Sequence, residues 1–138
     1  MYEITRMRDK HRKELVKNIR QVDAEEIWAY SGRTAKNVMD ELEVVGRHTA
    51  LAGLADGTLL CLFGAQPLSA LSPVATPWLL GTNALEHNTP AFLRMSKRWI
   101  QEQMSIYDIL ANFVDARNVK SIRWLKWLGF EVYPAVPT

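Results

Sequence analysis

The stretch from Asn112 to Phe130, NFVDARNVKSIRWLKWLGF, constrains the fold most, because it joins a strand to a helix with a clear signal at each helix end. The apolar segment Ile106 to Val114 predicts the strand. Asn118 precedes the helical pattern and is a preferred N-cap residue, while Gly129 follows it and is the preferred residue just beyond a helix. The sequence therefore predicts a strand, a short turn and a helix that ends at Leu128.

The rest of the chain alternates between strand and helix patterns. Asp56 and Gly57 separate two apolar runs, and because both residues tolerate positive φ they predict a two-residue hairpin. Pro77 lacks the N–H that a sheet ladder needs, so it predicts a bulge or a sheet edge. The expected strands are 2–7, 49–55, 58–65, 74–81, 106–114 and 130–136, and the expected helices are 8–20, 34–46, 89–105 and 118–128, with a short amphipathic segment at 24–30.

Composition fits one globular domain over residues 1–138, since 48% of the residues are hydrophobic and 23% are charged. A formal charge of +2 does not by itself indicate a polyanionic partner. The single cysteine, Cys61, lies in the apolar run LLCLF and predicts a buried thiol. We find no apolar run long enough for a membrane span, no signal peptide and no metal-ligand spacing around the histidines, so we expect a protein that is neither membrane-spanning nor secreted and holds no metal.

The helix pattern N-x-x-S-I-R-x-L-x-W-L-G-F resembles the last helix of the GCN5-related N-acetyltransferases, whose familiar form is N-x-x-A-x-x-x-Y-x-K-x-G-F. Asn118, Ser121, Gly129 and Phe130 fit this pattern. Leu125 stands where the family places the Tyr thought to protonate the departing CoA thiolate. The resemblance implies an α/β (α+β) fold with a mixed, mostly antiparallel sheet, helices on both faces and splayed central strands.

The same resemblance implies where acetyl-CoA would bind. It places the backbone of Trp78, Leu79, Leu80 and Gly81 against the pantetheine arm, which would pair with it like an added strand. It also gives Asn118 a hydrogen bond to the pantetheine, although Asn is a frequent helix cap and capping is the favoured role for this residue.

Two parts of the family's chemistry are altered in this chain. The loop 82–89, which should cradle the CoA pyrophosphate, contains no Gly, Lys or Arg, and its Glu86 would repel a phosphate. Leu125 cannot donate a proton. By composition alone, the possible general bases are Glu25, Glu26, His48 and Asp115, and no spacing selects among them.

The last helix also predicts an outer surface that could contact another macromolecule. At 100° per residue, Trp124 faces inward, whereas Trp127 lies outward among cations. An indole in this position either covers an edge of its own fold or contacts a partner. The expected partner-binding residues are Lys120, Arg123, Lys126 and Trp127. No nucleic-acid-binding motif accompanies them.

Residues 106–134 are in addition similar to a small protein family of short-tailed bacteriophages that is associated with the internal proteins of the virion. The shared pattern is N-x-x-x-I-R-aromatic-L-K-x-apolar-G. This resemblance implies our leading hypothesis: a phage protein with a degenerate acyltransferase fold that needs no cofactor, binds virion or host proteins, and resides in the virion or the host cytoplasm. The alternative hypothesis is an active acetyl-CoA-dependent N-acetyltransferase that modifies an amine on a host or phage target.

Overall fold

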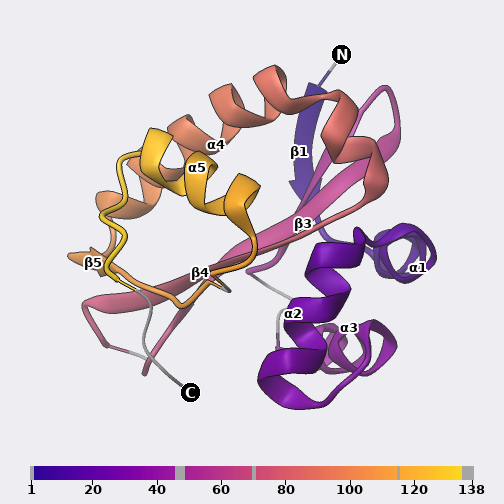
Figure 1. Cartoon of the computed structure of the whole chain (residues 1–138), viewed down its shortest axis with the longest axis horizontal. Coiled ribbons are helices and arrows are strands. Elements are labelled where there is room, and N and C mark those ends of the chain that lie inside the picture. The colour runs from indigo at the N-terminus through magenta and orange to yellow at the C-terminus, as the bar shows by residue number, and fades with distance from the viewer. Residues whose placement is uncertain (1, 46–48, 70, 115, 135–138) are drawn as a thin grey trace.

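A five-stranded sheet forms the centre of the protein, and its strands follow one another in chain order (Figure 1). The computed structural model describes residues 2–45, 49–69, 71–114 and 116–134. The strands are β1 (Tyr2–Arg6), β2 (Leu51–Ala55), β3 (Thr58–Pro67), β4 (Val74–Gly81) and β5 (Ile109–Leu110). The first four pair antiparallel, and β4 pairs with β5 in parallel. The predicted mixed, mostly antiparallel sheet is therefore confirmed.

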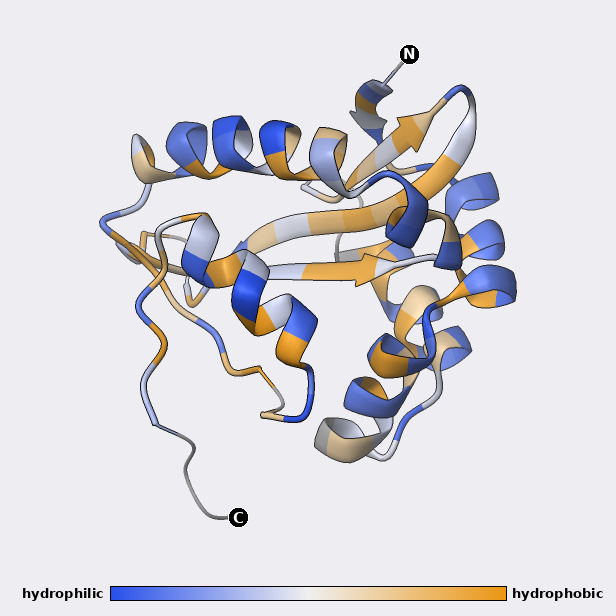
Figure 2. Ribbon diagram, turned by 45° about the horizontal axis from the view of Figure 1, so that its top comes forward, coloured by the Kyte–Doolittle hydropathy of each residue, from blue (hydrophilic) through white to orange (hydrophobic). Residues whose placement is uncertain are grey.

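Helices cover both faces of this sheet, as the sequence predicted. The helices are α1 (Asp9–Asn18), α2 (Gln21–Ser31), α3 (Ala35–Val45), the short 3₁₀ helix η1 (Asn83–His87), α4 (Thr89–Met104) and α5 (Val119–Trp127). The helices α4 and α5 lie together on one face, whereas α1 and α3 pack on the other (Figure 1). Apolar strands thus lie between helices whose outer turns are hydrophilic (Figure 2). None of the described helices is both long and apolar enough to cross a bilayer.

A bulge in β3 decides which of its side chains reach each face. Leu54 pairs with Leu59 and Gly53 pairs with Cys61, so Leu60 is an extra residue between two consecutive pairs. Because of this extra residue, Leu59 packs among α1 and α3, whereas Leu60 and Cys61 both pack under α4 and α5.

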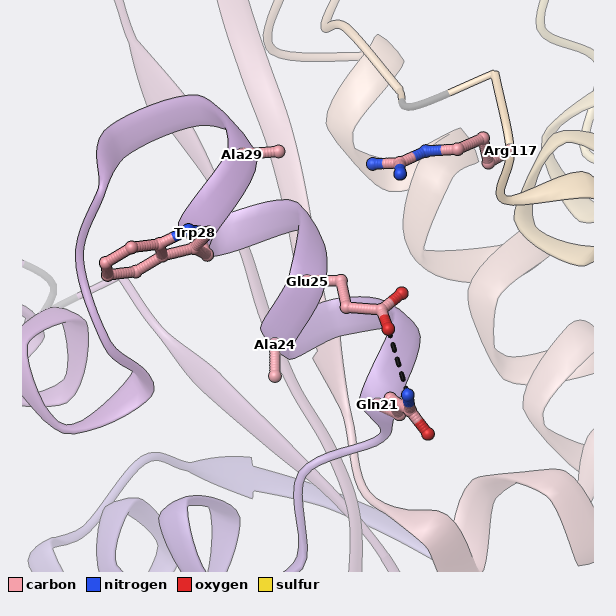
Figure 3. Close-up of a pocket in the computed structure, with 6 residues that line it drawn as sticks. All are labelled: Gln21, Ala24, Glu25, Trp28, Ala29 and Arg117. Atoms are coloured by element: carbon pink, nitrogen blue, oxygen red, sulfur yellow. Dashed lines mark hydrogen bonds between the residues drawn. The ribbon is translucent and has the colours of Figure 1, made fainter.

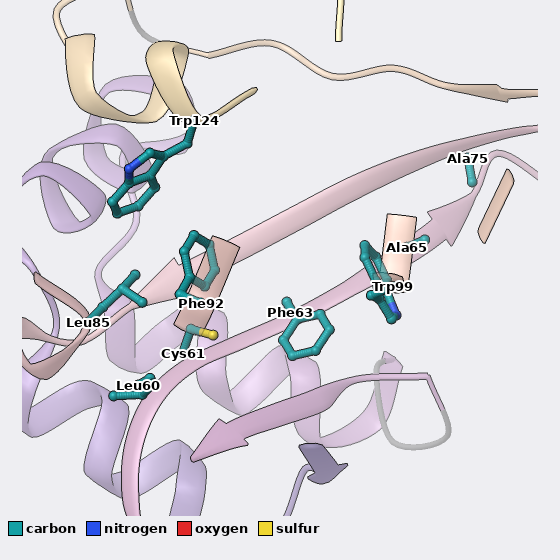
Figure 4. Close-up of a cluster of buried hydrophobic side chains, with 9 residues drawn as sticks. All are labelled: Leu60, Cys61, Phe63, Ala65, Ala75, Leu85, Phe92, Trp99 and Trp124. Carbon is teal, nitrogen blue, oxygen red and sulfur yellow. The ribbon is translucent and has the colours of Figure 1, made fainter. Parts of the chain in front are cut away.

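Aromatic rings fill the core under α4 and α5 (Figure 4). The rings of Phe63 and Trp99 meet edge to face with centroids 5.1 Å apart. Phe92 and Trp124 are 5.0 Å apart. Rings in such arrangements add a favourable interaction to the burial of their area, and here they join β3, α4 and α5 into one core.

Cys61 lies in this core and is expected to be unreactive in the folded protein. Burial raises the pKa of its thiol to about 12, and the thiolate is the reactive form. A thiol-specific chromogenic disulfide should therefore release no chromophore from the native protein, and one equivalent after denaturation in guanidinium, since the chain has 1 Cys. Rapid reaction without denaturant would contradict this burial.

The sequence signals at chain reversals are confirmed by the backbone. Asp56 and Gly57 both have positive φ, 48° and 84°, as a two-residue hairpin requires. At the end of α5, Gly129 has a φ of 103°, and the N–H of Phe130 donates to the carbonyl of Leu125. This is the αL closure that a glycine after a helix permits.

Two predicted strands differ from the structure. The expected strand 106–114 is reduced to Ile109–Leu110, because β4 offers it partners only at Val74 and Ala75. Residues 130–134 form no strand, and the rest of the predicted last strand lies outside the described residues. Of the two outcomes predicted for Pro77, the structure shows the sheet edge and no bulge: the pairing with β3 continues through Pro77 in register, and β5 pairs only with Val74 and Ala75. Gly46, the predicted end of the helix 34–46, lies outside the described residues.

Candidate active site

The free edge of β4 beyond β5 is the first component of the site. The N–H of Thr82 donates to Leu60 on β3, so even-numbered residues of β4 turn their backbone groups to β3 and odd-numbered residues turn theirs away. The carbonyl of Ala75 accepts from Ala111, and that of Pro77 accepts from the Asn112 side chain. Pro77 therefore loses no ladder bond, and the two strands separate at this point, as the expected splay requires.

Leu79 is the next odd-numbered residue, and both its backbone groups face the open side of β4. No described residue supplies a partner for them. Leu80 and Trp78, which were also expected to offer their backbone, turn toward β3 instead. Trp78 has a different role, since its indole lies 3.0 Å from the position that a Cβ on Gly64 would take.

The backbone of Gly81, also expected to bind the cofactor, is already occupied in this structure. Its N–H donates to a carboxylate oxygen of Asp23 over 2.6 Å, and its carbonyl accepts from the N–H of Arg20 over 2.8 Å. A Cβ at Gly81 would lie 2.8 Å from both Arg20 Nε and Leu85 Cδ2. Glycine is thus required here by the close approach of Arg20.

Arg20 and Asp23 form a buried ion pair at the end of β4. The guanidinium donates to the carboxylate through Nε at 2.9 Å and Nη2 at 3.0 Å, and each side chain is only 4% exposed. This bidentate geometry satisfies both charges, which burial otherwise makes costly. The third guanidinium nitrogen, Nη1, donates to Glu86 on η1 over 3.3 Å.

Lys120 on α5 completes a charge cluster, which here means Arg20, Asp23, Glu86 and Lys120. Its ammonium bonds the Glu86 carboxylate, and this bond is the chief cause that lowers the pKa of Glu86. The Trp124 ring lies beneath both cations, with centroid distances of 5.3 Å to Arg20 and 5.5 Å to Lys120. Although the loop 82–89 carries no cation of its own, two cations from distant segments meet at Glu86.

Asn118 has two separate roles at its two side-chain atoms. Its Oδ1 accepts from the N–H of Ser121 over 3.2 Å and so caps α5. Its Nδ2 is buried and has no hydrogen-bond partner. A buried donor without a partner costs free energy in the unliganded protein. A ligand that bonded this amide would leave the cap at Oδ1 intact.

An open groove of about 500 Å³ lies between α2 and the segment before α5 (Figure 3). Its lining residues are Gln21, Ala24, Glu25, Trp28, Ala29 and Arg117. Glu25 and Arg117 extend toward the groove from opposite walls (Figure 3). Gln21 Nε2 donates to Glu25 over 2.9 Å and orients the carboxylate. The α2 wall is bonded to β4, because Asp23 accepts from the N–H of Gly81.

The four candidate bases are placed differently. Glu25 lines the groove, whereas Glu26, on the same helix, does not. His48 and Asp115 lie outside the described residues. Leu125 is half-buried on α5 and has no acidic proton to donate. In the part of the chain that the structure describes, no group of three potential ligand side chains could hold a metal ion.

The expected partner-binding surface is partly engaged within the protein itself. Lys120 is bonded to Glu86, and Trp127, 50% exposed, lies under Lys97 of α4 at 4.8 Å from ring centroid to Nζ. Trp127 thus supports the packing of α4 on α5. Arg123 and Lys126 are exposed, and the inward position predicted for Trp124 is confirmed.

Sequence reasoning missed Arg20 and Asp23. Their partners lie 66 and 58 residues further along the chain, so no local spacing reveals the contact. The only sequence sign is that the two charges are three positions apart, which lets an Arg and an Asp meet at the start of a helix.

Comparison with solved structures finds the same fold in N-acetyltransferases. AAC(6')-Iy in complex with the bisubstrate analogue CoA-S-monomethyl-acetylneamine superimposes with a TM-score of 0.64 at 15% identity, over 100% of this chain and 96% of that one. An N-acetyltransferase from Staphylococcus aureus Mu50 gives 0.68 at 13% identity, over 95% and 84%. The aminoglycoside 6'-N-acetyltransferase AAC(6')-Ih from Acinetobacter baumannii gives 0.61 at 11%, over 100% and 96%.

At the level of sequence, no family model matches the chain and no curated protein is significantly similar to it. The structural relatives do not support the phage resemblance, which stays a prediction.

One expectation is corrected by these relatives. We expected a fold that needs no cofactor, yet AAC(6')-Iy was solved both with CoA and with a CoA-containing analogue, in a fold that spans the whole of this chain. One premise of that expectation also changes, because the Glu86 carboxylate, which was expected to repel phosphate, is paired with Lys120 and Arg20. The chain thus has the fold of the GCN5-related N-acetyltransferases.

Proposed function

We propose that the chain, as a single domain over residues 1–138, is an acetyl-CoA-dependent N-acetyltransferase that acts on a primary amine. The observation that carries the proposal is that both backbone groups of Leu79 face the open edge of β4 without a partner among the described residues, and the buried amide of Asn118 is a second donor without one. A pantetheine arm carries amides along an extended chain, and it needs strand-like backbone groups and a side-chain donor. The described residues supply both kinds of group, so they fit this cofactor.

The residues proposed to hold the cofactor are therefore fewer than the sequence suggested. Leu79 offers an N–H and a carbonyl on the open edge, and Asn118 offers Nδ2 while its Oδ1 keeps the helix capped. Bound there, acetyl-CoA supplies an acetyl group activated as a thioester. The acceptor amine must be neutral to attack it, because a protonated amine has no free electron pair.

We assign the general base to Glu25. It lines the groove, is exposed to solvent and is oriented by Gln21, so it can take a proton from an incoming ammonium group. Leu125 cannot return a proton to the departing thiolate, and we assign that proton to water in the open groove. The acceptor screen should include an aminoglycoside, because several structural relatives are named for that activity.

A calorimetric titration with acetyl-CoA tests the proposal directly. We expect saturable binding in the micromolar range, followed by CoA release in the presence of an acceptor amine. No heat at millimolar acetyl-CoA would overturn the proposed function.

A proline at position 79 is expected to weaken acetyl-CoA binding without disturbing the sheet. The Leu79 N–H points away from β3, so Leu79→Pro removes no ladder bond, as Pro77 already shows two residues earlier. Loss of one hydrogen bond to the ligand should weaken binding by about tenfold or more. Leu79→Ala is the matched control, because it shortens the side chain but keeps the N–H. Equal affinities of both variants, measured by calorimetry, would argue against backbone recognition at this residue.

A place in a virion or in the cytoplasm of an infected host stays a prediction from the phage resemblance. Under the proposed activity, the acceptor would then be an amine on a host or phage target. Mass spectrometry of purified particles would test this location.

A further inference from the structure

The net charge of the charge cluster bears on how the cofactor's phosphates bind. Asp23 neutralises Arg20, and Glu86 neutralises Lys120, so the four formal charges cancel. The two carboxylates differ in burial, since the Asp23 side chain is 4% exposed and the Glu86 side chain is 35% exposed. Asp23 is fixed by Arg20 and the Gly81 N–H, whereas Glu86 contacts its cations from the surface.

The N-terminus of α4, which attracts anions, lies beside the charge cluster. The 16-residue helix α4 begins at Thr89, directly after η1, and its N-cap Asn88 makes no capping bond. Asn88 instead accepts from the Tyr2 hydroxyl and donates to the carbonyl of Ala84. The positive end of the α4 dipole is therefore not offset by its own cap residue.

We propose that Glu86 is an internal competitor for the CoA diphosphate: its carboxylate holds Lys120 and Arg20 in the unliganded protein, and the diphosphate displaces it on binding. This inference rests on the proposed function and identifies the anion subsite of the same cofactor. Lys120 on α5 and Nη1 of Arg20 take the place of the glycine amides that the loop 82–89 lacks. Glu86 sets the affinity, because the subsite has no net positive charge until its carboxylate leaves.

The experiment compares two ligands, CoA and S-acetylpantetheine, which share the pantetheine arm but differ in the diphosphate and nucleotide. Titration calorimetry is carried out on the wild-type protein, Glu86→Gln, Lys120→Ala and Lys126→Ala. Glu86→Gln keeps a hydrogen-bond acceptor for the cations and removes the charge, so it should bind CoA about tenfold more tightly. Lys120→Ala should bind CoA about tenfold more weakly, and its affinity should depend less on salt.

The controls separate an effect at the diphosphate from a general effect on the fold. Neither Glu86→Gln nor Lys120→Ala should change the affinity for S-acetylpantetheine. Lys126→Ala removes an exposed lysine from the same helix and should leave CoA affinity unchanged. Melting temperatures measured in parallel report whether each variant folds.

The outcomes distinguish this inference from the proposed function. Weaker CoA binding by Glu86→Gln, or unchanged CoA binding by Lys120→Ala, would overturn the internal competitor while leaving the acetyltransferase proposal intact. Binding of neither ligand by the wild-type protein or by Glu86→Gln would overturn both.

Discussion

Replacing Asp23 by Ala is expected to lower the free energy of unfolding by about 3–5 kcal/mol, the usual cost of removing one partner from a buried ion pair. The substitution leaves the guanidinium of Arg20 and the N–H of Gly81 buried without their acceptor. Glu86 cannot replace Asp23, because it reaches a different guanidinium nitrogen from the protein surface. Urea denaturation followed by circular dichroism measures the loss.

Asp9→Ala is the matched control for this prediction. Asp9 also bonds an Arg three residues away, Arg12, but its side chain is 63% exposed. Exposed pairs of this kind contribute little, so the control should lose much less stability than Asp23→Ala. Equal losses in the two variants would show that the buried pair at Arg20 does not hold α2 to the sheet.

Glu25→Gln is expected to reduce kcat by a factor of about 10² to 10⁴, the usual contribution of a general base. Gln keeps the size of the side chain and loses only the ability to accept a proton. Because Glu25 is exposed on α2 and away from the core, stability should change by no more than about 0.5 kcal/mol. Acetyl-CoA affinity should also stay the same, since the base contacts the acceptor amine.

Glu26→Gln is the control, because it lies next in the same helix but does not line the groove. Equal rate losses for the two variants would remove Glu25 from its proposed role.

The parts of the fold that the sequence predicted well depend on neighbouring residues. The hairpin at Asp56-Gly57 and the ends of α5 at Asn118 and Gly129 are specified by residues that suit one backbone conformation. The order of the elements followed from such signals together with hydrophobic periodicity. The predicted sheet class and the helices on both faces then followed from the family resemblance carried by the last helix.

The parts that the sequence did not predict depend on distant contacts. The bulge at Leu60 arises from the register between β2 and β3, which no single strand pattern reports. The strand 106–114 was predicted too long, because its apolar residues do not reveal that β4 diverges from it after Ala75. The charge cluster brings together Arg20, Glu86 and Lys120 from three separate segments, so the residues of the loop 82–89 alone did not reveal the two cations beside it.

The attachment of α2 has a further consequence for the choice of acceptor. Of the α2 side chains that the structure describes, only Asp23 is buried, and Trp28 is 64% exposed. This helix is attached to the sheet by hydrogen bonds and an ion pair at its first turn, and its later turns bury little apolar surface. A tilt of α2 about its first turn would therefore widen or narrow the groove without disrupting the hydrophobic core. Under the proposed activity, substitutions along the outer turns of α2 would therefore change the size of amine that the groove accepts, while the sheet beneath stays the same.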